Sequence, residues 1–81
     1  MRDNVEARRF EIGEPGQIVF ADYRRSGELL FIDHVETPPA LRGAGAAGAL
    51  MEAIAERAHE EGRTIVPVCS YAAAWLKRRR L

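Results

Sequence analysis

The first half of the chain contains three separate segments rich in apolar residues. Phe10 and Ile12 alternate with charged residues, and the Gly-Glu-Pro-Gly sequence at 13–16 then indicates a turn. A second apolar segment spans residues 18–23. A third, residues 29–35, is largely apolar at both alternating sets of positions, as expected of a central strand covered on both faces. This pattern predicts three strands joined by hairpins.

The second half changes to a helical period over residues 44–61. One stripe of this segment is apolar and the other side carries glutamates. The apolar positions are Ala47, Leu50, Met51, Ile54 and Ala58. Gly62 is a suitable helix C-cap, residues 65–69 predict a short strand, and a second helix is expected to begin near Ser70 as N-cap and run toward Arg80. The predicted element order is β-β-β-α-β-α, an α+β fold within one domain of residues 1–81.

Composition and charge narrow the class of protein. The chain has 81 residues, of which 47% are hydrophobic and 30% charged, with a formal net charge of zero, which describes a soluble globular domain. Residues 1–5 are too polar for a signal peptide, and no apolar segment approaches the ~20 residues of a membrane helix. The single cysteine, Cys69, cannot form an internal disulfide. We therefore expect a cytoplasmic protein without a metal site.

Residues 43–48 form a literal G-x-G-x-x-G sequence, which raises the question of dinucleotide binding. That fingerprint requires the first glycine directly at the end of a strand and an acidic residue at the end of the next strand. Here seven residues separate Val35 from Gly43, and the strand at 65–69 ends without a carboxylate. A Walker-type loop is excluded too, because no Gly-Lys-Ser/Thr follows the glycines. The length of the chain also leaves no room for a two-part dinucleotide fold.

The same stretch suits a different phosphate ligand. Residues 43–48 have side chains no larger than methyl, so a pyrophosphate could reach the unpaired N–H groups of the first helical turn. The positive end of the helix dipole favours an anion there. The alternative interpretation is a helix start whose small residues only allow close packing against the sheet.

With Arg42, Gly45 and Ala47 on its positions, this stretch resembles the R/Q-x-x-G-x-G/A signature of the GNAT superfamily of acetyl-CoA-dependent N-acetyltransferases. A His-x-Glu-x-Pro segment at 34–38 and a Val-Pro-x-Cys segment at 66–69 are similar to those of small, single-domain GNAT-like proteins. The resemblance covers about residues 16–77. It departs from full-length GNAT enzymes, which carry helices between the first strands and a familiar Asn and Tyr in the last helix. This chain has no room for those helices, and has Ser70, Trp75 and Lys77 in the last one.

The resemblance implies a minimal GNAT-like fold with a central, mostly antiparallel sheet. Its central strands, here 29–35 and 65–69, splay apart and admit the pantetheine of acetyl-CoA. The implied cofactor is therefore acetyl-CoA or CoA, and the implied reaction is acetyl transfer to an amine. The residues expected to bind the cofactor are Val35, Arg42, Gly43, Ala44, Gly45, Ala46, Ala47, Gly48 and Ser70.

The same comparison implies candidate catalytic residues near the strand ends. His34 or Glu36 would be the base for the acceptor ammonium, with backbone N–H groups near His34 and Val35 as oxyanion donors. Cys69 or Tyr71 would donate a proton to the departing thiolate. Cys69 also precedes a helix N-terminus, where a thiol becomes a better nucleophile. Each residue has a structural alternative: a hydrogen-bonded histidine, a solvated glutamate, a buried inert thiol, and a tyrosine that packs in the core or against the cofactor.

Other classes of function stay open at this point. Residues 77–80 are a basic cluster that could hold nucleic acid, but the helix dipole also favours cations at a helix C-terminus, and a net-neutral chain argues against a nucleic-acid partner. One of these arginines could instead reach the 3′-phosphate of CoA. A non-catalytic CoA-binding or protein-interaction module is the main alternative to an enzyme. The expected partners are a small-molecule or protein amine, with the chain a monomer or a homodimer.

Overall fold

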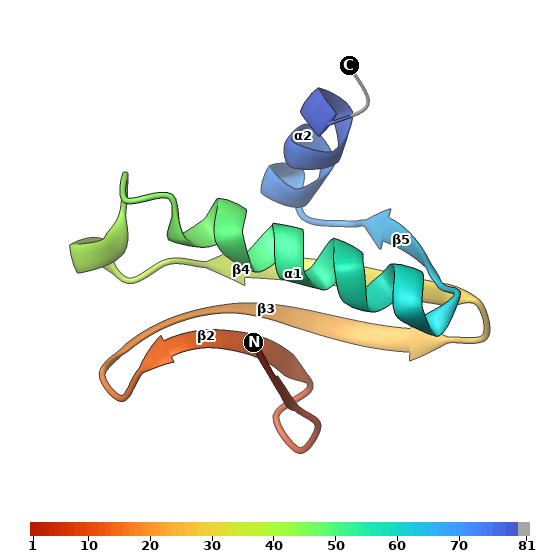
Figure 1. The fold of residues 1–81 in the computed structure, drawn as a ribbon, viewed down its shortest axis with the longest axis horizontal. Helices are drawn as coiled ribbons and strands as arrows, with labels where there is room; N and C mark the ends of the chain where they lie inside the picture. Colours follow the sequence, from red (N-terminus) through yellow and green to blue (C-terminus); the bar gives the residue numbers. More distant parts are fainter. Residues whose placement is uncertain (80–81) are drawn as a thin grey trace.

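A computed structural model describes residues 1–79 of the chain as a single five-stranded sheet with two helices on one side (Figure 1). The strands are β1 (Arg2–Asn4), β2 (Arg9–Glu14), β3 (Gln17–Ser26), β4 (Leu29–Glu36) and β5 (Thr64–Pro67). The two α-helices are α1 (Ala46–Glu61) and α2 (Ser70–Arg79), and a 3-10 turn, η1 (Pro39–Leu41), precedes α1. The strands follow one another in sequence order across the sheet. All neighbours are antiparallel except β4 and β5, which are parallel, so the mostly antiparallel α+β fold is confirmed.

Turn chemistry explains the hairpin between β2 and β3. Gly13 pairs with Ile18 and has φ of 122°, a conformation that favours glycine. A Cβ built on Gly13 would lie 2.3 Å from the carbonyl oxygen of Gln17. The Gly-Glu-Pro-Gly turn therefore fixes both the reversal and the register of these strands.

The hydrophobic core lies between α1 and one face of the sheet. Its largest fully buried side chains come from β2, β3, β4 and α1; they are Phe10, Val19, Leu30, Ile32, Leu50, Met51 and Ile54. The apolar stripe predicted for α1 supplies Leu50, Met51, Ile54 and Ala58 to this core. No helix among residues 1–79 is long and apolar enough to cross a bilayer.

Within residues 1–79 no α-helix lies on the opposite face of the sheet, so the prediction that residues 29–35 are covered on both faces is wrong. Phe20 and Phe31 lie on this uncovered face, because side chains alternate along a strand and their neighbours in β3 and β4 are buried in the core. The guanidinium of Arg9 lies 3.8 Å from the ring centroid of Phe20, and that of Arg24 lies 4.4 Å from the ring centroid of Phe31. These arginine side chains shield the two rings from water.

Strand β1 is absent from the sequence prediction, and it makes the order β-β-β-β-α-β-α. Residues 2–4 have no alternation of apolar and polar side chains that would indicate a strand. Polar contacts hold them in the sheet instead. Asp3 accepts hydrogen bonds from the Tyr23 hydroxyl (2.5 Å) and from Arg25 Nη2 (3.1 Å). Arg2 pairs with Glu11 on the neighbouring strand.

Three element ends also differ from the prediction. Helix α1 begins at Ala46 instead of residue 44, because Gly45 is its left-handed N-cap. Strand β5 ends at Pro67, and α2 then begins at Ser70. The carbonyl of Cys69 accepts a hydrogen bond from the Ala73 N–H (3.0 Å), so Cys69 and not Ser70 occupies the N-cap position. The predicted end of this helix at Arg80 lies outside the described residues.

Strands β4 and β5 separate partway along their length, as the predicted splay requires. Their register runs from Leu29 opposite Thr64 to Ile32 opposite Pro67. Within the described part of the chain, β4 then continues to Glu36 without a strand partner on that side. A β-bulge against β3 occurs at the same point, because the residues opposite Asp22 and Tyr23 are two apart in β4.

Candidate functional site

The glycine loop between η1 and α1 presents its backbone to solvent. Gly43 and Gly45 both have φ of 81°, which L side chains rarely adopt. A Cβ built on either glycine would meet nothing within 4 Å. The loop is therefore open, which argues against the interpretation that its small residues only allow close packing on the sheet.

Helix α1 begins without a side-chain cap. Its N-cap is Gly45, which makes no side-chain hydrogen bond, and the first helical hydrogen bond runs from the Ala49 N–H to the Gly45 carbonyl (3.0 Å). The N–H groups of residues 46–48 thus precede the helical ladder and lie at the positive end of the helix dipole. No acidic side chain occupies this first turn. These features are those of an anion-binding helix terminus.

A cavity of about 330 Å³ adjoins this helix terminus. The glycine loop, η1 and the start of α2 line it, through Thr37, Leu41, Arg42, Gly43, Gly45, Ala46, Ala47, Gly48 and Tyr71. Most of the predicted cofactor-binding residues are therefore brought together. Ala44, Val35 and Ser70 are not in the lining: Ala44 and Ser70 are exposed, and the Val35 side chain packs against the core.

Helix α2 contributes Tyr71 to the lining of this cavity, and Trp75 of the same helix lies near Gly48 outside the lining. The Tyr71 hydroxyl and the Trp75 indole nitrogen each lie 3.9 Å from the position of a Cβ on Gly48. The sequence predicts Tyr71 as a proton donor, whereas the lining residues Thr37 and Leu41 are not among the predicted site residues. The i, i+4 spacing of the two aromatic residues in α2 is the sequence signal that could have paired them.

The candidate bases lie on the uncovered face of the sheet. His34 pairs with Asp22 and Glu36 pairs with Phe20 across the strands, so both share the face of those residues. The His34 Nε2 and Glu36 Oε1 atoms are 2.9 Å apart. Both side chains are exposed, at 54% and 45%. A histidine and a carboxylate in hydrogen-bond contact can exchange a proton with a bound amine.

Arg42 connects this pair to the glycine loop. Its Nη2 lies 4.0 Å from Glu36 Oε2, and its Nε donates to the Thr37 carbonyl (3.3 Å). The side chain is 66% exposed and so free to reorient toward a ligand in the cavity. The neighbouring carboxylate of Asp33 is committed elsewhere, because hydrogen bonds from Arg24 (2.8 and 2.9 Å) lower the pKa of Asp33. Glu36 is therefore the carboxylate nearest in sequence to His34 that Arg24 does not hold.

Cys69 lies where the two strands separate. Its N–H and that of Val68 both donate to the Ile32 carbonyl (3.0 Å each), two residues before His34 in β4. The Cys69 side chain is partly buried and packs against the core, whereas His34 points to the uncovered face. Within residues 1–79 the structure thus groups His34 with Glu36, and Tyr71 with the glycine loop, but it does not join the four candidate catalytic side chains by hydrogen bonds.

Sheet topology, splayed strands and an uncapped helix behind an open glycine loop together define an acetyltransferase-like domain. Comparison with protein families agrees, since the model of the family described as GCN5-related N-acetyl-transferase matches residues 9–80. The chain belongs to this family, as the sequence resemblance indicates. A comparison with curated protein sequences found no match.

Proposed function

We propose that the chain binds acetyl-CoA at the cavity beside α1 and transfers its acetyl group to an amine. The observation that carries this proposal is the open glycine loop, where two left-handed glycines expose the first-turn N–H groups of α1 to a cavity. The N–H groups of residues 46–48 would hold the pyrophosphate, and Arg42 would add a positive charge. Acetyl-CoA fits this site because no side chain fills the space that a phosphate needs.

The unpaired edge of β4 supports the placement of the pantetheine. Backbone groups of residues 33–36 on the side of β5 have no strand partner in the described chain, so they are available to an extended ligand. Such a ligand would run from the glycine loop toward Cys69 and His34. When bound, acetyl-CoA supplies an acetyl group activated as a thioester.

The chain's own residues would then manage the protons. His34, oriented by Glu36, would act as the general base that takes the proton from the acceptor ammonium. Cys69 or Tyr71 would supply a proton to the departing sulfur. Binding both substrates in one complex would contribute much of the rate through proximity.

The acceptor, assembly and location are part of the proposal. The acceptor is a small-molecule or protein amine, and the chain acts as a monomer or a homodimer. We do not propose a nucleic-acid partner, because Lys77, Arg78 and Arg79 lie in the last turn of α2, where the helix dipole favours cations. Arg80 lies outside the described residues. We propose a cytoplasmic location, since the fold uses no disulfide.

A non-catalytic CoA-binding module is the second candidate function. The observation that favours it is the absence of hydrogen bonds, within the described residues, between the Cys69 or Tyr71 side chains and the His34–Glu36 pair. Turnover separates the two candidates. CoA binding without acetyl transfer to a panel of small amines, lysine peptides and protein N-termini would favour the module.

A thermal-shift measurement tests the ligand directly, with CoA, acetyl-CoA, NAD and ATP compared under the same conditions. CoA and acetyl-CoA are expected to raise the melting temperature, because a ligand that binds only the folded state stabilises it. Stabilisation by NAD but not by CoA would overturn the proposal.

A further inference from the structure

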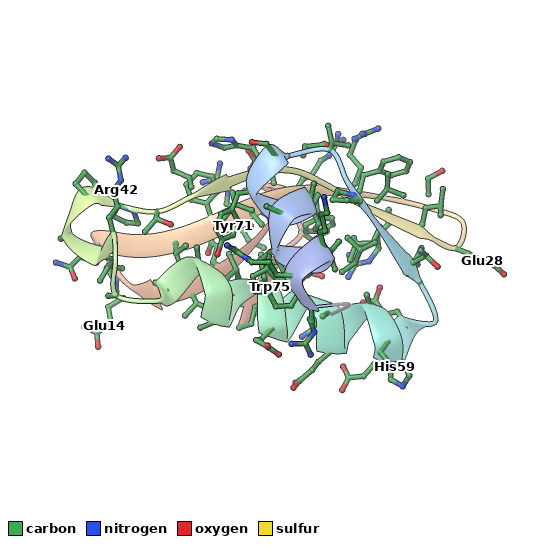
Figure 2. All side chains as sticks on the ribbon, turned by 90° about the horizontal axis from the view of Figure 1, so that it is seen from above. Glu14, Glu28, Arg42, His59, Tyr71 and Trp75 are labelled. Atoms are coloured by element: carbon green, nitrogen blue, oxygen red, sulfur yellow. The ribbon has the colours of Figure 1, made fainter. Side chains whose placement is uncertain are left out.

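The two halves of β4 are held differently. The strand runs from the turn at Glu28 toward the loop that carries Arg42, and these two residues stand at opposite ends of the molecule (Figure 2). Up to Ile32 it pairs with β3 on one side and with β5 on the other. Beyond Ile32, β3 is its only strand partner in the described chain. The segment 33–36, which contains the candidate bases, is therefore held from one side.

A β-bulge lies at the start of this segment. Ile32 pairs with Tyr23, and His34 pairs with Asp22, the residue next to Tyr23 in β3. Asp33 is therefore an extra residue that no residue of β3 opposes. The pairing with β5 ends at the same place, so Asp33 is the first residue of β4 without a strand partner on either side.

The extra residue sets the face that the following side chains occupy. Side chains alternate between the two faces of a regular strand. Ile32 is buried in the core and Val35 packs against the core, although the two residues are three apart. Between them, Asp33 contacts Arg24 on the uncovered face, and His34 shares that face with its cross-strand partner. Without the bulge, regular alternation after Ile32 would turn His34 to the core and Val35 to water.

Arg24 holds the extra residue in place. Its Nε and Nη2 donate to the two carboxylate oxygens of Asp33, at 2.8 and 2.9 Å. These hydrogen bonds lower the pKa of Asp33 and raise the pKa of Arg24. The guanidinium also lies 4.4 Å from the ring centroid of Phe31, its cross-strand neighbour. A bidentate contact restricts both distance and direction, so it selects Asp33 and not His34 as the residue that stays out of register.

We propose that Arg24 and Asp33 are positioning residues for acetyl transfer, whose ion pair holds the bulge that turns His34 and Glu36 to the uncovered face. This inference rests on the proposed function, and it adds the side from which the acceptor arrives. Helix α1 packs against the core face of the sheet, whereas no α-helix of residues 1–79 covers the other face. The acceptor amine would therefore reach His34 from the uncovered face.

NMR tests the register of β4 without any ligand. In the unmodified chain, cross-strand NOEs are expected between Asp22 and His34, which oppose each other. Asp33→Asn removes the carboxylate charge, and Arg24→Lys keeps the cation but cannot make two parallel hydrogen bonds. Both variants are expected to weaken these NOEs and to give a second set of backbone resonances for residues 33–36. Unchanged NOEs and a single set of resonances in both variants would overturn the inference.

Acetyl transfer to butylamine, as the probe amine, measures the consequence for catalysis. The melting temperature should change little in either variant, because the pair is exposed. The kcat is expected to fall about 10- to 100-fold, as it does when a catalytic group is misplaced. The Kd for CoA should stay unchanged, because neither Arg24 nor Asp33 lines the cavity beside the glycine loop. Combining Arg24→Lys with Asp33→Asn should lower kcat no further, since the two residues act as one unit.

Arg9→Lys is the matched control. Arg9 also covers a phenylalanine ring, 3.8 Å from the centroid of Phe20, and its Nη2 lies 3.4 Å from Asp22 Oδ1. It belongs to the regular pairing of β2 with β3, so the register of β4 should not depend on it. The variant should keep both the NOEs and kcat. An equal fall in kcat in Arg9→Lys and Arg24→Lys would overturn the inference, because the loss of any arginine on this face would then have the same effect.

The NMR measurement separates this inference from the proposed function. Unchanged NOEs in variants of a chain that acetylates an amine would reject the positioning role alone. If the unmodified chain binds CoA but leaves butylamine unreacted, the NOEs alone decide. If the unmodified chain binds no CoA, the proposed function is wrong, and the role of Arg24 and Asp33 in acetyl transfer is wrong with it.

Discussion

Arg25 and Glu61 form a bidentate ion pair that joins β3, the middle strand of the sheet, to the end of α1. Arg25 Nε and Nη2 donate to the two carboxylate oxygens of Glu61, at 2.9 and 2.7 Å. The same guanidinium donates to Asp3 of β1 at 3.1 Å. The hydrogen bonds that Arg25 donates to Glu61 lower the pKa of Glu61, and the same bonds raise the pKa of Arg25. One side chain thus connects β1, β3 and α1 at the end of the helix remote from the glycine loop.

This pair predicts a stability loss in acid. Because the pKa of Glu61 is lower in the folded chain than its ordinary value of 4.5, the unfolded chain binds more protons below neutral pH. The contribution of Glu61 to the free energy of unfolding is fully present above pH 4.5, the ordinary pKa, and is lost as the pH falls through the lower pKa of the folded chain. The urea midpoint of unfolding should therefore decrease less between neutral pH and about pH 3 in Glu61→Gln than in the unmodified chain.

Glu60→Gln is the matched control for this measurement. Glu60 is the adjacent residue of α1 and has a 72% exposed side chain, and its one ion partner among residues 1–79 is Arg57, at 3.8 Å. Exposed pairs of this kind contribute little, so the Glu60→Gln curve should follow that of the unmodified chain. If the urea midpoint of Glu61→Gln depends on pH as that of the unmodified chain does, the Arg25–Glu61 pair is not a cause of the stability loss in acid.

Gly45→Glu is expected to abolish CoA binding without unfolding the chain. Its carboxylate would stand at the α1 N-terminus and repel the pyrophosphate. Gly16→Glu is a matched control, because Gly16 has a similar φ of 87° and also has nothing within 4 Å of an added Cβ. Both variants carry similar backbone strain, yet only Gly45→Glu should lose the calorimetric signal with CoA. Unchanged CoA affinity in folded Gly45→Glu would rule out the phosphate-loop assignment.

Cys69 separates three mechanisms by its chemistry with acetyl-CoA alone. A covalent nucleophile would gain one acetyl mass before any amine is added, and Cys69→Ser would lose both adduct and activity. A proton donor would form no adduct, while Cys69→Ala would lower turnover by roughly 10²–10⁴-fold. A structural thiol predicts neither effect, only a modest loss of stability.

We expect direct transfer without an acyl-enzyme. The Cys69 side chain packs against the core and is only partly exposed, which suits a proton donor at the strand separation better than a free nucleophile. Intact-protein mass spectrometry provides the measurement. A stable acetyl adduct on Cys69 that an added amine then consumes would reverse this expectation.

Ile54 reports on the packing between α1 and the sheet. It is fully buried, so Ile54→Ala should lower the free energy of unfolding by about 2–5 kcal/mol through lost burial and a residual cavity. Ile54→Val removes a single methylene and should cost only about 0.5–1.5 kcal/mol. Denaturant titration measures both, and equal losses in the two variants would contradict close packing at this position.

Local patterns in the sequence were sufficient for the parts of the fold that depend on local chemistry. The apolar stripe of α1 and the small residues at 43–48 predicted the helix and the loop before it, with only the start of the helix two residues too early. Strand β1 could not be predicted from local patterns, because its position in the sheet depends on residues distant in sequence. Tyr23 and Arg25 hold it through hydrogen bonds to Asp3. Periodicity carries no information on such contacts.

The candidate site shows the same limit. The match to a known signature located Arg42 and the glycines, which are contiguous in sequence. Trp75 reaches Gly48 only because α2 packs along α1, a tertiary relationship across 27 residues of chain that no short motif encodes. Likewise, the apolar residues of β4 could not show which face of the sheet remains uncovered. An arginine side chain can cover a phenylalanine ring as a helix would, and Arg24 covers Phe31 in this way.

The uncovered face of the sheet is adapted to water by its arginine side chains, which cover Phe20 and Phe31. A helix laid on that face would have to displace Arg9 from Phe20 and Arg24 from Phe31, and would also strip the ion partners Asp22 and Asp33 of water. Grafting extra helices onto this sheet would therefore require apolar replacements at these arginines and acids at the same time. Conversely, deleting the covering helices from a larger domain would leave bare aromatic rings unless guanidinium groups were installed to shield them.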